Sequence, residues 1–131
     1  MHETEIKDEE FLYRVVKVNP NLWKEEEKRP SSASFKDSFG VSVDRQGGRT
    51  KEKVIFDFIE RFGQDEIKAV IRVTAGFCRD KGAFIKNDIN DDGSNDNHAL
   101  ILRSENEITL TSSVARALSK ESEIVHMNSD L

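Results

Sequence analysis

Residues 29–45 read RPSSASFKDSFGVSVDR, a stretch in which five serines are interleaved with regularly placed Phe and Val residues and an Arg stands at each end. Serine-rich segments are often loose linkers, but regular apolar residues favour a segment anchored in a hydrophobic core. We expect an irregular turn or a single helical turn over residues 31–38 and a strand over residues 39–43. The stretch would then join a strand before it to a helix after it.

The segment before this stretch, residues 11–18, reads FLYRVVKV and ends at an Asn-Pro turn. Its β-branched and aromatic residues predict the first strand. Alternation along a strand puts Arg14 on the same face as Leu12 and Val16, so that a charge projects from an apolar surface. Two interpretations stay open: an Arg reaching out along the sheet edge, or an Arg held beside a pocket to bind an anion.

The segment after the stretch gives the clearest helical pattern in the chain. A single apolar stripe at helical period runs through residues 54–62 and predicts a helix that packs on the rest of the domain. Thr50 is suited to the N-cap and Gly63 to the helix end. The members of the stripe are Val54, Ile55, Phe58, Ile59 and Phe62.

The second half of the chain predicts further strands and one more helix. Alternation over residues 67–77 predicts a long strand, with the face that carries Ile67 and Ile71 buried against the preceding helix. Shorter strands are expected at residues 83–85 and 99–102. A last helix begins at Thr109 or Thr111 and ends near residue 120.

Together these segments predict a single α+β domain over residues 1–131, with a small mixed or antiparallel sheet of four to five strands and two main helices. The patterning is weak at both ends, so residues 1–9 and about 122–131 are expected to be flexible. The sequence does not determine the oligomeric state.

The net charge of the chain limits the kinds of binding partner that we expect. Lys and Arg number 20 and Asp and Glu 25, which gives a net charge of −5. Extended nucleic-acid binding needs a concentrated basic surface, so we do not expect it. A small anion remains possible, because one local pair of Arg residues is enough to hold a phosphate.

Cysteine content and targeting signals point to a cytoplasmic protein. Cys78 is the only cysteine, so no intrachain disulfide can form, and its apolar neighbours predict an inert buried thiol. The first ten residues lack the pattern of a secretion signal. No apolar run approaches the ~20 residues that span a bilayer.

The loop before the predicted strand at residues 99–102 contains the most motif-like acidic pattern. Asp88, Asn90, Asp92, Gly93 and Asp96 follow the first half of a calcium-binding loop, but the position of the bidentate carboxylate is an alanine. We therefore expect an acidic turn and no metal site. His98, where this loop enters the strand, could transfer a proton, hold a ligand or simply hydrogen-bond the loop.

No phosphate-binding glycine loop and no nucleophile elbow is present in the sequence, and no catalytic residue is assigned. A Ser-His-Asp triad could be assembled from Ser31, His98 and one of many Asp residues, but only geometry identifies such a triad. The expected ligand-binding site combines two cations, three hydroxyls and an imidazole from separate segments: Arg14, Ser31, Ser32, Ser42, Arg45 and His98.

Three blocks of sequence resemble blocks that recur in small uncharacterised bacterial proteins: RPSSASFK at residues 29–36, VSVD at residues 41–44 and NHA at residues 97–99. This resemblance covers most of the chain but brings no assigned activity.

The order of elements is also similar to that of ADP-ribosyltransferase-like and RES-type NAD-consuming domains. Such domains open with a strand that carries an Arg, here Arg14, followed by a strand with a functional Ser, here Ser42, then a helix and a long strand. They place a Glu on a late strand, where this chain has His98. The resemblance implies that Arg14 contacts phosphate, Ser42 contacts ribose or nicotinamide and His98 transfers a proton.

These observations predict a small cytoplasmic domain that binds a small anionic ligand or a protein partner, with no cofactor. The alternative is a nucleotide-directed enzyme of ADP-ribosyltransferase-like type, for which NAD is the expected cofactor.

Overall fold

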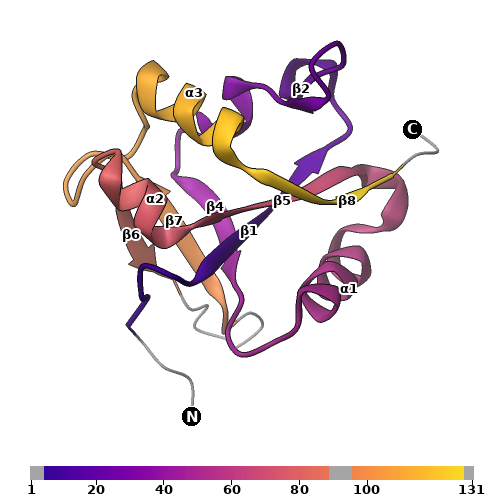
Figure 1. Cartoon of the computed structure of the whole chain (residues 1–131), viewed down its shortest axis with the longest axis horizontal. Helices are drawn as coiled ribbons and strands as arrows, with labels where there is room; N and C mark the ends of the chain where they lie inside the picture. The colour runs from indigo at the N-terminus through magenta and orange to yellow at the C-terminus, as the bar shows by residue number, and fades with distance from the viewer. Residues whose placement is uncertain (1–4, 89–95, 129–131) are drawn as a thin grey trace.

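The computed structural model describes residues 5–88 and 96–128, which form one α+β domain around a six-stranded antiparallel sheet (Figure 1). The strand order is β6-β7-β4-β1-β5-β8. The predicted class and the two main helices are confirmed, with six strands in the sheet where four or five were expected. The strands are β1 (Phe11–Lys17), β4 (Val41–Arg45), β5 (Ile67–Thr74), β6 (Phe84–Asn87), β7 (His98–Leu102) and β8 (Glu123–Met127).

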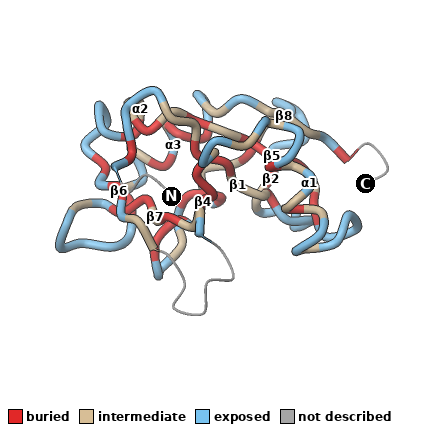
Figure 2. The backbone as a smooth tube through the Cα atoms, turned by 90° about the horizontal axis from the view of Figure 1, so that it is seen from below, coloured by how far each residue is buried: buried red, intermediate tan, exposed pale blue. Residues whose placement is uncertain are grey.

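Helices cover both faces of this sheet. On one face lie α2 (Ala75–Asp80), α3 (Ser112–Glu121) and the short helix η2 (Ser32–Phe35), which bury the larger apolar cluster. On the other face α1 (Lys51–Phe62) packs on β1 and β5 and buries a smaller cluster. Figure 2 shows that the buried segments follow the central strands, while the exposed segments follow the outer loops.

The predicted helix after the Gly-Gly turn is confirmed as α1. The Thr50 hydroxyl accepts a hydrogen bond from the Lys53 amide, which makes Thr50 the N-cap. Gly63 ends the helix with a positive φ of 85°, a conformation that suits glycine. Within the predicted stripe Val54 and Phe58 are buried, and the other three members are partly buried.

The long strand expected over residues 67–77 is wrong in two respects. It ends at Thr74, whose hydroxyl accepts a hydrogen bond from the Phe77 amide and begins α2. Of the face expected against the preceding helix, Ile67 does lie in the cluster beneath α1, whereas Ala69, Ile71 and Val73 pack on the side of α2 and α3. Val70, on the other face, lies beneath α1.

The hydroxyl-rich stretch folds as expected at its start and differs at its end. Residues 32–35 form η2, and Phe35 is buried. The strand that follows is β4 and begins at Val41, because Phe39 stays outside it in a turn and is 86% exposed. Before this stretch, Trp23 packs into the larger core from a two-residue hairpin of β2 (Trp23–Lys24) and β3 (Arg29–Pro30).

Residues 1–9 and about 122–131 were expected to be flexible, but the described parts of both segments contact the rest of the domain. Ile6 is buried in the larger core, and residues 123–127 form β8, which pairs with β5.

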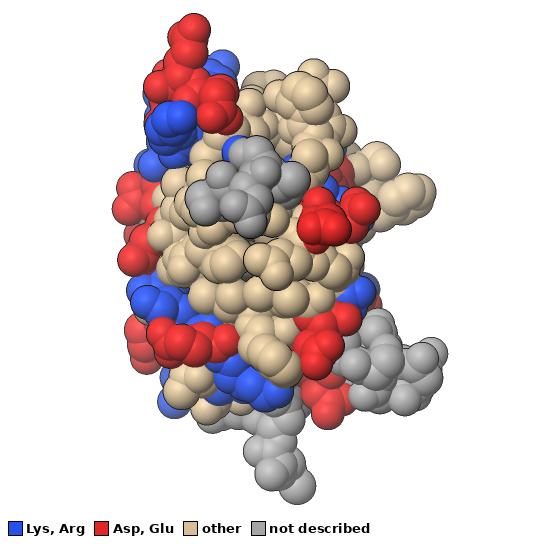
Figure 3. Space-filling model, turned by 90° about the vertical axis from the view of Figure 1, so that its right-hand side faces the viewer, with Lys and Arg blue, Asp and Glu red and all other residues tan. Residues whose placement is uncertain are grey.

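Among residues 5–88 and 96–128, no helix has the length and apolar character needed to cross a bilayer. On the face shown in Figure 3, acidic and basic side chains lie beside one another around a mostly uncharged centre. The remaining short helices are η1 (Pro20–Leu22) and η3 (Gln64–Glu66).

Candidate functional site

A cleft opens beside α1, because this helix packs on β1 and β5 and leaves part of the same sheet face uncovered. Its volume of about 640 Å³ is in the range of small-molecule sites. Three of the six residues expected from the sequence line it, namely Arg14, Ser42 and His98. The other lining residues are Val15, Lys17, Leu22, Asp37, Val43, Asp44, Phe58, Arg61 and Phe62.

Arg14 is held at the edge of this cleft by contacts within the protein. Strands β1 and β4 pair only at their Leu12 and Tyr13 positions and then separate. The Arg14 side chain bridges the resulting gap, donating to the Ser34 carbonyl at 2.8 Å and to the Ser42 carbonyl at 2.7 Å. A third bond, at 2.9 Å, goes to the carboxylate of Asp37. Arg14 therefore lines the cleft, but its guanidinium is largely used to join β1 to β4, to η2 and to Asp37.

A polar row crosses the sheet on the face that carries the cleft. His98 on β7 is paired with Asp44 on β4, and Asp44 with Tyr13 on β1. The row continues through Arg72 on β5 to Glu123 on β8. Arg72 donates to the Tyr13 hydroxyl at 3.1 Å and to the Glu123 carboxylate at 2.8 Å. Successive strands thus bring together side chains that are far apart in the sequence.

His98 is fixed at the end of this row by Asp88, which follows β6. The ring Nδ1 lies 2.9 Å from the Asp88 carboxylate and 3.1 Å from the Asp88 carbonyl. Because both neighbours are acceptors, Nδ1 carries the proton and donates it. The Asp88 amide donates back to the His98 carbonyl at 2.9 Å. This arrangement leaves Nε2 as the open position of a ring that lines the cleft.

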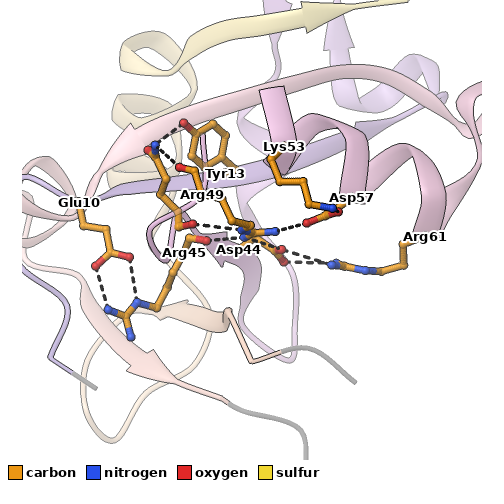
Figure 4. Close-up of polar contacts among 9 residues, drawn as sticks. Glu10, Tyr13, Asp44, Arg45, Arg49, Lys53, Asp57 and Arg61 are labelled. Atoms are coloured by element: carbon orange, nitrogen blue, oxygen red, sulfur yellow. Dashed lines mark hydrogen bonds and ion pairs between the residues drawn. The ribbon is translucent and has the colours of Figure 1, made fainter. Parts of the chain in front are cut away.

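Asp44 is the buried centre of an ion-pair network between the sheet and α1 (Figure 4). Two arginines contact its carboxylate, Arg49 at 3.3 Å and Arg61 at 3.3 Å. Arg49 also binds Asp57 of α1 at 2.9 Å, and Lys53 reaches the same carboxylate at 2.7 Å. The Asp44 charge is thus compensated by cations on two segments, as a buried carboxylate requires.

Two cations lie over the aromatic wall that α1 gives to the cleft. The Lys17 ammonium is 5.5 Å from the Phe62 ring centre, and the Arg61 guanidinium is 5.4 Å from the Phe58 ring centre. Both are within the range of cation–π attraction. Among residues 5–88 and 96–128, no carboxylate forms an ion pair with Lys17. The wall therefore combines apolar surface with positive charge.

The other three expected residues do not join this cleft. Arg45 lies on the opposite sheet face with Val43, where it is buried and donates two bonds to the Glu10 carboxylate at 2.9 and 3.0 Å. It contacts a different hollow, next to the Gly47-Gly48 turn. The Ser31 hydroxyl donates to the Asn21 carbonyl at 2.6 Å, and Ser32 begins η2.

Sequence reasoning missed nine of the residues that line the cleft, and the polar or aromatic ones that matter most to the argument include Lys17, Asp44, Phe58 and Arg61. Asp44 had a signal, because it lies within the VSVD block, next but one to Ser42. Phe58 belonged to a stripe that was assigned to the core alone. Arg61 and Lys17 had no signal, since isolated cations in a chain that is 34% charged do not stand out.

The chain matches no protein-family model, no curated protein and no solved structure. The acidic loop considered for calcium falls largely on residues 89–95, which lie outside the described residues, so that interpretation is untested. Of its described members, Asp88 is engaged with His98.

Proposed function

We propose that the protein is a cytoplasmic binding domain whose cleft beside α1 holds a small anionic ligand with an apolar part. The observation that carries this proposal is the pair of cations, Lys17 and Arg61, placed over the rings of Phe62 and Phe58. An anionic group would contact the cations, and the apolar part of the ligand would lie on the aromatic wall.

The size and hydrogen-bonding groups of the cleft support a small molecule in preference to a protein partner. The cleft has a volume of about 640 Å³ and is lined by elements from both halves of the chain, as in typical ligand sites. Ser42 and His98 add hydrogen-bonding groups to the lining of the cleft. A protein partner would instead need a larger exposed surface.

The alternative, a nucleotide-directed enzyme that uses Arg14 for phosphate, has less support. Arg14 already donates to two carbonyls and one carboxylate, so phosphate would have to displace those bonds. Lys17 is better placed for an anion, because no carboxylate among the described residues pairs with it, whereas Arg61 also shares its guanidinium with Asp44. NAD is therefore one of the ligands to be tested, but we do not expect it to bind more tightly than the other anions.

Binding is tested by titrating the full chain with inorganic pyrophosphate, citrate, ATP and NAD, using calorimetry and thermal shift. We expect at least one of these anions to bind and Lys17→Ala or Arg61→Ala to weaken that binding roughly 10- to 150-fold, since a charged hydrogen bond contributes about 1.5–3 kcal/mol. Lys120→Ala on α3 is the matched control and leaves affinity unchanged. Absence of binding by all four anions at millimolar concentration would contradict the proposal.

A further inference from the structure

His98 and Asp88 form an imidazole–carboxylate pair at the cleft. Asp88 holds Nδ1 at 2.9 Å, and the open Nε2 belongs to a residue that lines the cleft. Asp88 itself is not a lining residue and lies behind the ring. This is the order in which a carboxylate orients a histidine base toward its target.

Ser42 supplies a hydroxyl on the neighbouring strand. In the β4–β7 pairing Asp44 lies opposite His98 and Ser42 lies opposite Leu100, so Ser42 and His98 are diagonal neighbours on one sheet face. Diagonal neighbours have β-carbons less than ~8 Å apart, a gap that a hydroxyl and an imidazole can close. Within the described part of the chain, neither the Ser42 hydroxyl nor His98 Nε2 has a hydrogen-bond partner.

We propose that Ser42 is a nucleophile, His98 its general base and Asp88 the residue that positions His98, and that together they hydrolyse small anionic esters. This inference rests on the proposed function, because the anionic part of the substrate would bind the cations of the same cleft. Ser31, which a sequence reading would choose, is excluded by its bond to the Asn21 carbonyl.

The chemical steps are redox-neutral and need only water. Ser42 Oγ attacks the acyl carbon while its proton passes to His98 Nε2, and the bond from the acyl carbon to the leaving oxygen breaks. His98 then gives this proton to the leaving alkoxide. Water next attacks the acyl-serine, passing a proton to His98, which returns it to Ser42 Oγ as the carboxylic acid leaves.

The charges of the cleft fit this substrate class. Arg61 and Lys17 lie on the α1 side, facing the wall that carries Ser42 and His98. Lys17, which no described carboxylate pairs with, can compensate a carboxylate or phosphate on the substrate. Arg61, which also pairs with Asp44, can add to the stabilisation of the negative charge that develops on the acyl oxygen. An ester with a free carboxylate should therefore be preferred over a neutral ester.

The nucleophile is tested with diisopropyl fluorophosphate on the full chain, followed by intact mass and peptide mapping. We expect one adduct, located on Ser42, and His98→Gln should slow labelling roughly 100-fold or more, the usual contribution of a general base. Asp88→Asn should slow labelling and Asp88→Glu should restore part of the rate. Ser113→Ala, an exposed serine of α3, is the matched control.

Substrate preference is tested with the mono-p-nitrophenyl ester of succinate against neutral p-nitrophenyl acetate. We expect faster turnover of the succinate ester, lost in Ser42→Ala, and a reduced preference in Lys17→Ala. The melting temperature of every variant is recorded to show that it folds. Peptide mapping of the wild-type protein locates the adduct independently of the variants. An adduct elsewhere, no adduct, or labelling unaffected by His98→Gln would overturn the inference.

The two proposals can fail separately. Pyrophosphate or ATP binding that persists in Ser42→Ala, without labelling of the wild type, would leave the binding function standing and remove the nucleophile. Ser42 labelling with no effect of Lys17→Ala or Arg61→Ala on either ester would support the nucleophile and overturn the anionic substrate class.

Discussion

Arg14 shows how the partners of a single residue decide its role. The sequence placed it on an apolar strand face, which was correct, but its three acceptors lie 20–28 positions further along the chain. A sequence cannot reveal that β1 and β4 separate at this point. The charged residue that looked like a ligand contact mainly hydrogen-bonds the protein itself, through the Ser42 carbonyl of β4 and the Ser34 carbonyl of η2.

Replacing Arg14 should therefore lower stability as well as any binding. We expect Arg14→Ala to reduce the free energy of unfolding by about 2–3 kcal/mol, because two carbonyls and a carboxylate lose a charged donor. Asp37→Asn is the control and should cost less than about 1 kcal/mol, since its exposed ion pair is screened by water. Urea unfolding measures both; equal losses would show that the carbonyl contacts contribute nothing.

Cys78 should be inert in the folded protein. It is fully buried, and burial raises the pKa of its thiol to about 12, although the charge of Arg79 acts in the opposite direction. At pH 8 the thiolate is therefore scarce and shielded. We expect no reaction with a disulfide reagent in buffer and one equivalent of reaction in urea, followed by absorbance. Rapid reaction of the native protein would mean that α2 opens easily.

At the scale of elements, local signals predicted most of what the structure shows. Thr50 caps α1, as its position before an apolar stripe indicated, and Thr111, one of the two threonines considered for α3, caps that helix. Thr74 is also an N-cap, but the sequence analysis did not identify it. The β-branched residues before Thr74 continue the strand pattern, which hides the start of α2. Strand β8 had weak patterning, since it lies at a sheet edge and its residues are only partly buried.

Helix α1 provides a matched pair of aromatic residues. Phe58 is buried against the sheet, whereas Phe56, two positions earlier, is 53% exposed. Phe58→Ala should cost about 3–5 kcal/mol because a cavity replaces the ring. Phe56→Ala should change stability by less than about 0.5 kcal/mol. Denaturant unfolding measures both, and a loss below about 1 kcal/mol for Phe58→Ala would mean that the stripe is not part of the core.

At the scale of the whole molecule, the site depends on strand register, which the sequence does not reveal. Arg14, Ser42 and His98 were expected together on chemical grounds, and the cleft does collect them. Asp88, the hydrogen-bond partner of His98, was interpreted only as part of the acidic loop. The contact between the two residues depends on how β6 and β7 align, and the sequence does not show that alignment. Arg45, one residue from Asp44, points to the opposite face, since neighbours in a strand alternate.

The ion-pair network between the sheet, the Gly-Gly turn and α1 should make stability depend on pH through Asp57 (Figure 4). Burial alone would raise the pKa of Asp57, but hydrogen bonds from Lys53 and Arg49, with their charges, lower it overall from 3.8. The folded state thus holds this proton less tightly than the unfolded state. The stabilisation is present above pH 3.8 and is lost as the pH falls through the lowered pKa.

The comparison of wild type with Asp57→Asn tests this coupling. At pH 7 we expect the variant to be less stable by about 1 kcal/mol, because Arg49 and Lys53 lose their shared carboxylate. At an acidic pH below the lowered pKa of Asp57, the aspartic acid is protonated and the difference should disappear. Glu60→Gln, on the same helix and without an ion pair among the described residues, is the control and should show no such trend. A difference in unfolding free energy that is the same at both pH values would mean that Asp57 contributes by packing, and that its charge does not couple α1 to the sheet.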